Sequence, residues 1–130
     1  MILLDTNICI YIINKKPPTV IERFKKFSTG EIGVSSVVAA ELAFGAEKSG
    51  SERNKSALQL FLAPLVILPF DESCIWAYAE LRTQLEKLGK PIGSLDTMIA
   101  SHAIAVNLPL VTNNQKEFSK VQGLKLLNWI

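Results

Sequence analysis

Short apolar runs that end abruptly in polar residues set the strongest limit on how this chain can fold. The first run is Met1–Leu4, and the carboxylate, hydroxyl and amide of Asp5-Thr6-Asn7 follow it at once. An apolar run of this length, bounded by turn-prone residues, predicts a short buried β-strand. Further strands are predicted at 32–34, 66–68 and 108–112, with a final edge strand at 124–129.

The segments between these strands carry apolar residues at helical spacing. Helices are predicted at 7–14, 19–27, 36–48, 52–62, 72–88 and 94–106, with one helical turn at 115–120. Their expected N-caps are Thr6 or Asn7, Thr19, Ser35 or Ser36, Asp71 and Ser94. Strands that alternate with helices predict an α/β fold, in which a parallel sheet of about five strands has helices on both faces. We expect one domain over residues 1–130.

Charge and composition exclude several classes of protein. Fourteen Lys and Arg against twelve Asp and Glu give a net charge of +2, which excludes a histone-like polycation. The longest apolar stretches, such as Ile8–Ile13, are too short for a transmembrane helix, and Asp5 interrupts the region where a signal peptide would be apolar. Cys9 and Cys74 lie in apolar segments, which favours buried free thiols in a reducing cytoplasm over a disulfide or a metal-ligand pair.

Three acidic residues stand in apolar surroundings near predicted strand ends. Asp5 ends the first strand, while Glu41 and Asp96 each lie on the apolar stripe of a predicted helix. Because open α/β sheets bind ligands at the carboxyl ends of their strands, we expect these acids at one edge. A divalent cation would allow all three to stay ionised. Oxygen ligands favour Mg²⁺ or Mn²⁺. Zinc is not favoured, because the chain has a single histidine and its two cysteines lack the spacing of zinc ligands.

Each of these acids also has a simpler structural explanation. Asp5 could be only a helix cap, and Glu41 could pair with an arginine such as Arg82. Asp96 could be an ordinary first-turn acid, which the helix dipole favours. The metal site would be absent only if all three of these explanations were correct.

Four blocks of sequence place these acids beside hydroxyl and amide side chains. The blocks are Met1–Asn7, Ser35–Leu42, Gly93–Ala100 and Leu110–Asn114. In their order and spacing they resemble a PIN-domain ribonuclease, and the likeness covers essentially the whole chain. Glu41–Lys48 and the tail Asn113–Phe118 resemble most closely the VapC toxins of bacterial toxin–antitoxin pairs. The resemblance implies a PIN-like three-layer sandwich.

The resemblance also assigns roles to residues of this sequence. Asp5, Glu41 and Asp96 match the acidic metal site, with Asp5 and Asp96 as direct Mg²⁺ ligands and Glu41 acting through water. Thr112 matches a hydroxyl that hydrogen-bonds within the acidic cluster. Asn114 stands where many PIN domains have a fourth acid, so one metal ion is expected and two are not. It would position a ligating water.

By the same resemblance the chain is expected to be a Mg²⁺-dependent endoribonuclease, with Mn²⁺ as a substitute. Thr6 and Asn7 would orient Asp5. A metal-activated water would attack the phosphodiester in line, leaving a 5′-phosphate and a 3′-hydroxyl. The expected substrate is tRNA or another structured RNA.

The implied partners are a second copy of the chain and a VapB-like antitoxin. The antitoxin would lay its C-terminal segment in an apolar groove over the active site and would itself bind operator DNA. This chain would therefore meet DNA only indirectly, and no membrane. Candidate groove and dimer surfaces are the apolar helices at 8–13, 20–27 and 57–62.

Two other functions stay open at this stage. A catalytically weak PIN-fold binding module could work mainly through its antitoxin complex, although intact Asp5, Glu41 and Asp96 argue against it. A phosphotransfer domain could use Asp5 as the phosphorylated residue. That class requires further acids beside the first strand end, where Leu4 and Asn7 stand.

Several remaining polar residues have two interpretations each. We expect His102 at the surface or an interface rather than as a catalytic base. Glu117 is expected to be a solvated helix acid, although it could reach the site. Arg82 could pair with the acids or with RNA phosphate. Six lysines near strand-end loops could follow an RNA backbone but are more simply solvated: Lys15, Lys16, Lys48, Lys87, Lys90 and Lys116.

Overall fold

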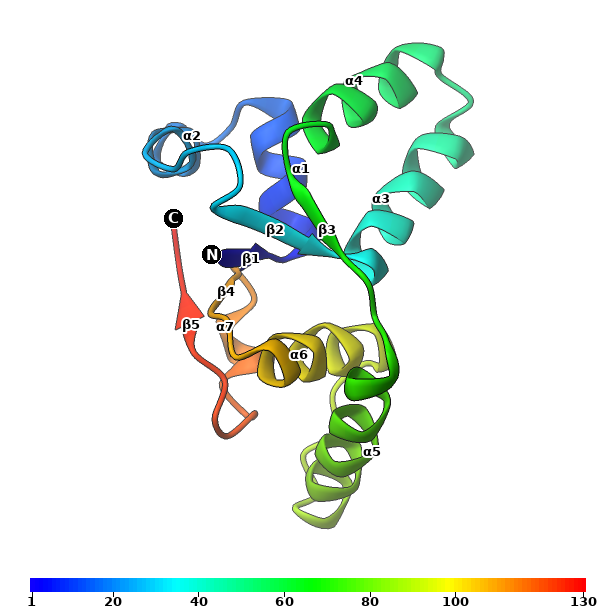
Figure 1. The fold of residues 1–130 in the computed structure, drawn as a ribbon, viewed down its shortest axis with the longest axis vertical. Helices are drawn as coiled ribbons and strands as arrows, with labels where there is room; N and C mark the ends of the chain where they lie inside the picture. The colour runs from blue at the N-terminus through cyan, green and yellow to red at the C-terminus, as the bar shows by residue number, and fades with distance from the viewer.

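A computed structural model describes residues 1–130 as five strands and seven helices (Figure 1). The strands are β1 (Ile2–Leu4), β2 (Ile32–Ser35), β3 (Val66–Leu68), β4 (Leu110–Val111) and β5 (Leu126–Leu127). The helices are α1 (Thr6–Asn14), α2 (Pro18–Lys25), α3 (Ser36–Ser49), α4 (Glu52–Leu62), α5 (Glu72–Lys87), α6 (Ser94–Val106) and α7 (Gln115–Phe118). None of these helices combines the length and the apolar character that a membrane span requires.

The strands form one parallel sheet in the order β3-β2-β1-β4-β5. Helices α1 to α4 lie on one side of the sheet, and α5 and α6 lie on the other (Figure 1). The α/β fold that the sequence predicts is therefore confirmed. Because β1 is central and every pairing is parallel, the residue after β1 lies in the middle of the carboxyl edge.

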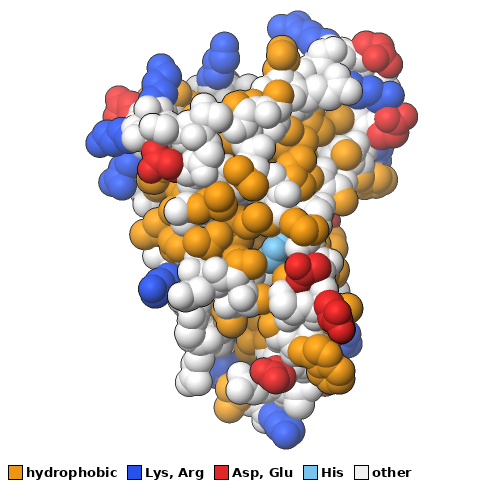
Figure 2. Space-filling model, viewed as in Figure 1, with side chains coloured by type: hydrophobic (Ala, Val, Ile, Leu, Met, Phe, Trp, Pro, Cys, Tyr) orange, Lys and Arg blue, Asp and Glu red, His pale blue; other side chains and the backbone are white.

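The core is centred on the three inner strands. The residues of β1, β2 and β4 are all buried, as expected for strands with helices on both faces. The edge strands β3 and β5 are only partly buried. Close packing also explains one glycine: a Cβ at Gly33 would lie 3.2 Å from both the Met1 sulfur and the Val66 carbonyl oxygen. On the face in Figure 2, hydrophobic side chains run across the middle of the molecule.

Three of the expected helix caps are wrong. The α1 cap is Asp5, whose carboxylate accepts from the Thr6 N–H, because Thr6 is already helical. Helix α2 begins at Pro18 rather than after Thr19, since a proline in the first turn loses no helical hydrogen bond. Gly93 occupies the α6 cap position, so α6 has no side-chain cap.

Three strands are shorter than the predicted apolar runs: β1 begins at Ile2 rather than Met1, β4 covers 110–111 rather than 108–112, and β5 covers 126–127 rather than 124–129. Strand β4 begins at Leu110, because Pro109 has no N–H to add to the ladder. Two apolar helix residues lie on the outside: Phe44 is 67% exposed and Leu88 is 60% exposed. Leu88 is the C-cap of α5, whose C-terminal end extends beyond the sheet (Figure 1). The prediction of buried free thiols at both cysteines is confirmed.

Candidate active site

Asp5 is a nearly inaccessible carboxylate at the centre of the sheet's carboxyl edge, with 4% of its surface exposed. One oxygen accepts a 2.8 Å hydrogen bond from the Thr6 backbone N–H. The other accepts a 2.7 Å hydrogen bond from the Thr112 hydroxyl. Burial raises the pKa of Asp5, and these two hydrogen bonds oppose the rise. The backbone holds Asp5 as well, since its N–H donates to the Val111 carbonyl at 2.9 Å.

Thr112 is fixed as the donor in its contact with Asp5. Its hydroxyl oxygen accepts from the Asn114 backbone N–H at 2.9 Å, so its single proton is free for the Asp5 carboxylate. The Thr112 backbone is itself held by a bond to the Leu127 carbonyl in β5. Two strands next to each other in the sheet therefore orient Asp5, although Thr112 is 107 residues away in sequence.

Asp96 and Glu41 face the same region from two helices. Both are half-buried, and neither carboxylate receives a hydrogen bond from the protein. Burial is the main cause that raises the pKa of Asp96, and the charges of Asp5, Glu117 and Glu41 raise it further. The structure thus brings together the acids that the sequence singled out.

No cationic side chain neutralises this group. The salt bridges of the molecule involve other acids, and Asp5, Glu41 and Asp96 take part in none of them. One buried and two half-buried acids without a counter-charge, all offering oxygen donors, fit a hard divalent cation. No three His, Cys, Asp or Glu side chains form a ready-made ligand group, however, so the acids share a region without being at coordination distance.

Comparison with known proteins agrees with this geometry. Residues 2–124 match the family model of the PIN domain. The chain belongs to the PIN-domain family. Ribonuclease VapC2 of Rickettsia felis is 48% identical over 129 residues, covering 98% of this chain and 96% of the relative. The tRNA(fMet)-specific endonuclease VapC of Shigella flexneri is 41% identical over 128 residues, with the same coverage of 98% and 96%.

Solved structures support the same assignment. VapBC2 from Rickettsia felis, bound to a promoter DNA fragment, matches with a TM-score of 0.93 and 47% identity over 100% of both chains. DNA-bound VapBC from Salmonella typhimurium matches with a TM-score of 0.93 and 38% identity, again over 100% of both chains. This PIN domain is therefore a nuclease of the VapC type, which removes the phosphotransfer alternative.

Glu117 of the PIN domain is closer to the site than the sequence indicated. It was expected to be a solvated acid, yet its side chain is only 32% exposed and pairs with Lys120 at 3.3 Å. Its charge also raises the pKa of Asp96, ahead of Glu41 among the causes. One feature of the sequence could have indicated this: Glu117 lies one helical turn after Asn114, which itself follows a predicted strand.

Arg82 and Thr6 make contacts other than those expected. Arg82 does not pair with Glu41: its guanidinium donates to Glu86 at 3.2 Å and to the Tyr78 hydroxyl at 3.0 Å. Thr6 orients Asp5 through its backbone N–H only, since its hydroxyl oxygen is buried without a partner. The explanation of Glu41 as a partner of Arg82 is therefore wrong.

His102 was expected at the surface or an interface, and this prediction is wrong. The residue is fully buried, with its ring edge-on against Phe70 at a centroid distance of 5.7 Å. Its Nδ1 lies 2.7 Å from the Ser35 hydroxyl. A lone histidine among small apolar residues gives no sequence signal that separates an exposed position from this buried one.

A cleft of about 450 Å³ opens beside the acids, between α1, α3 and α4. Thr6, Asn7 and Glu41 lie at its polar end. Its apolar wall includes Ile10, Ile13, Leu42, Ala57 and Leu58. Of the three apolar segments proposed as groove or dimer surfaces, 8–13 and 57–62 line this cleft, and no residue of 20–27 does.

Proposed function

We propose that this PIN domain is a Mg²⁺-dependent endoribonuclease and the toxin of a VapBC-type toxin–antitoxin pair. Its substrate would be tRNA or another structured RNA. The observation that carries the proposal is the buried Asp5 carboxylate, which Thr112 orients and which lies near Asp96 and Glu41. None of these three acids forms a salt bridge. The Shigella flexneri relative, a tRNA(fMet)-specific endonuclease, supports the choice of substrate class.

In this proposal Asp5 and Asp96 hold the cation directly, and Glu41 acts through water. Mn²⁺ would substitute for Mg²⁺. The bound cation supplies charge neutralisation at the phosphate and lowers the pKa of water. Thr112 keeps one Asp5 oxygen in place. Each carboxylate oxygen has a further lone pair that could accept a cation. Asn114 would position a water, and Glu117 adds negative charge next to Asp96.

The proposed inhibitor is the C-terminal segment of a VapB-like antitoxin, lying in the cleft between α1, α3 and α4. The apolar wall suits an amphipathic peptide, and the polar end places that peptide beside Glu41 and Asn7. The similar structures from Rickettsia felis and Salmonella typhimurium are VapBC complexes with DNA. We further propose a homodimer that contacts operator DNA only through the antitoxin, in the cytoplasm.

The test is cleavage-site mapping on total RNA with purified protein. Wild type and Asp96→Asn are compared in Mg²⁺, in Mn²⁺ and in excess chelator. We expect discrete cuts with 5′-phosphate ends, present only with metal and lost in the variant. Equal cleavage by the variant, or cleavage that persists in chelator, would rule out the proposed mechanism.

A further inference from the structure

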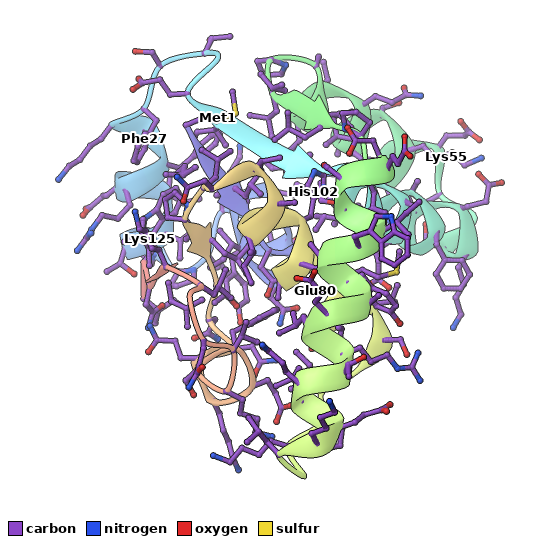
Figure 3. The ribbon with its side chains drawn as sticks, turned by 60° about the horizontal axis from the view of Figure 1, so that its bottom comes forward. Met1, Phe27, Lys55, Glu80, His102 and Lys125 are labelled. Carbon is purple, nitrogen blue, oxygen red and sulfur yellow. The ribbon has the colours of Figure 1, made fainter.

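The only histidine of the chain makes a buried hydrogen bond that the proposed chemistry does not use. His102 Nδ1 and the Ser35 hydroxyl are 2.7 Å apart, and the two residues are separated by 67 positions in sequence. Both residues are essentially inaccessible. Figure 3 shows His102 where α6 meets the end of β2 and the start of α5. This contact therefore joins two distant elements of the fold.

The two elements it joins are the ones that carry the helix-borne acids. His102 lies on α6, six positions after Asp96, and Ser35 is the N-cap of α3, six positions before Glu41. At a rise of 1.5 Å per residue, the bond lies about 9 Å along each helix axis from the acid. This hydrogen bond therefore connects α3 and α6, the two helices that carry Glu41 and Asp96.

Glu41 and Asp96 depend on such a link more than Asp5 does. Asp5 has its own hydrogen bonds to Thr112 and Thr6. The carboxylates of Glu41 and Asp96 receive none, so the relative position of their two helices decides how far apart they stand. Outer contacts that orient metal ligands usually change metal affinity by about 10–100-fold when they are removed.

The surroundings of His102 keep the link in one arrangement. Ser35 already accepts from the Val37 N–H at 3.1 Å, which fixes its hydroxyl at the start of α3. The ring of Phe70 packs on the imidazole, and the Phe70 N–H donates to Ser36 at 2.9 Å. Burial lowers the pKa of His102, which favours the neutral ring. In either neutral tautomer, Nδ1 can share one hydrogen bond with Ser35.

We propose that His102 is a positioning residue whose hydrogen bond to Ser35 sets the spacing of α3 and α6, and thereby the affinity of Glu41 and Asp96 for a divalent cation. The inference rests on the proposed metal-dependent function. A residue that merely filled the core would be replaceable by any side chain of similar volume. A residue that acts through this bond requires a polar atom at the Nδ1 position.

Two amide substitutions separate these roles. In His102→Asn the amide lies where Nδ1 stands and can reach Ser35, whereas in His102→Gln it lies near the position of Nε2 and cannot. Ser101→Ala is the matched control: Ser101 is also fully buried on α6, but its hydroxyl donates to the Met98 carbonyl within the same helix. It therefore removes a buried hydrogen bond without touching α3.

The measurement is Mn²⁺ binding to each folded variant without RNA, followed by electron paramagnetic resonance of the free ion. RNA cleavage at varied Mn²⁺ is recorded alongside. We expect His102→Gln to weaken Mn²⁺ binding by roughly 10-fold, while His102→Asn and Ser101→Ala stay close to wild type. In cleavage, the Gln variant should need more Mn²⁺ for half-maximal rate but approach the wild-type rate at saturation.

Equal Mn²⁺ affinity in His102→Asn and His102→Gln would overturn the inference, whatever their stability. Ser35→Ala offers a second approach should His102→Gln fail to fold. It removes the same bond, so its Mn²⁺ affinity should fall as well, and unchanged affinity counts against the link. If the wild type binds Mn²⁺ and cuts RNA, and the variants bind Mn²⁺ equally well, only this inference is wrong. A wild type that does neither defeats the proposed function too.

Discussion

The acids of this PIN domain are held in two different ways. Asp5 follows a central strand, is buried, and has a hydrogen bond at each oxygen. Asp96 and Glu41 project from helices, are half-buried, and have no hydrogen bond of their own. One part of the site is thus preorganised by the sheet, while the other can still move when a cation arrives.

This difference follows from where each residue is attached. Asp5 directly follows β1, whose position is fixed by a neighbouring strand on both sides. Asp96 lies in the first turn of α6, which lacks a side-chain cap. Substitutions at the two kinds of position should therefore differ in size and in kind, and the following predictions run from the largest expected effect to the smallest.

Asp5→Asn should abolish RNA cleavage. The amide is nearly isosteric but carries no charge, so the preorganised cation ligand is lost. We expect a fall in the cleavage rate of more than roughly 100-fold, above the range for outer-shell partners. The rate is measured at saturating Mg²⁺. If high Mg²⁺ restores the wild-type rate, Asp5 is not the principal ligand.

Thr112→Val should reduce cleavage by about 10–100-fold, because the Asp5 carboxylate loses the donor that orients it. Thr112→Ser keeps the hydroxyl and is the matched control, for which we expect near-wild-type rates. Rates of both variants are compared at several Mg²⁺ concentrations. The preorganisation of Asp5 would be refuted by a valine variant as active as the serine variant.

Glu117→Gln should change cleavage only several-fold but should lower the pKa of Asp96, since one of the charges that raises it is removed. Titration of the Asp96 carboxyl by nuclear magnetic resonance in metal-free protein measures this directly. Glu86→Gln is the control, because Glu86 pairs with Arg82 on α5. An unmoved Asp96 pKa would place Glu117 outside the acidic group.

In the metal-free protein, ionisation of Asp5 and Asp96 should reduce stability as the pH rises. The pKa values of Asp5 and Asp96 are raised above the ordinary 3.8, so the folded state binds more protons than the unfolded state just above that pH. The penalty is absent below 3.8 and is complete once the pH exceeds the raised values. The melting temperature of Asp5→Asn should therefore rise relative to that of the wild type as the pH increases, by roughly 2–5 °C across this range.

Thermal unfolding with and without Mg²⁺ checks this prediction. Added cation should stabilise the wild type and leave Asp5→Asn nearly unchanged, because only the wild type gains from neutralising the buried charge. If the difference in melting temperature between wild type and Asp5→Asn in chelator does not change with pH, ionisation of Asp5 does not reduce stability in the metal-free site.

The parts of the molecule that the sequence predicted well are those with strong local signals. The short apolar run at the start of the chain indicates a buried strand, which the structure has at Ile2–Leu4, and Asp5 stands directly after it. The helix from Glu52 to Leu62 has a serine cap and clear periodicity, and its bounds match. These features depend on neighbours in sequence, which is why they could be predicted without a structure.

The parts that were missed depend on tertiary packing. Phe44 shares the apolar stripe of α3, but it is 67% exposed, with the Lys48 ammonium 5.9 Å from its ring centroid. His102 is buried because Ser35, far away in sequence, provides its partner. The position of Glu117 beside Asp96 requires α7 to turn back toward α6. None of these contacts has a signature in local sequence.

The order of the strands also has a consequence for how the protein is made. The central strand β1 is synthesised before its neighbour β4, and the Thr112 that orients Asp5 is added 107 residues after it. A nascent chain emerging from a ribosome has Asp5 but neither the strand that covers it nor the hydroxyl that holds it. The contact that orients Asp5 can therefore form only after Thr112 has been translated.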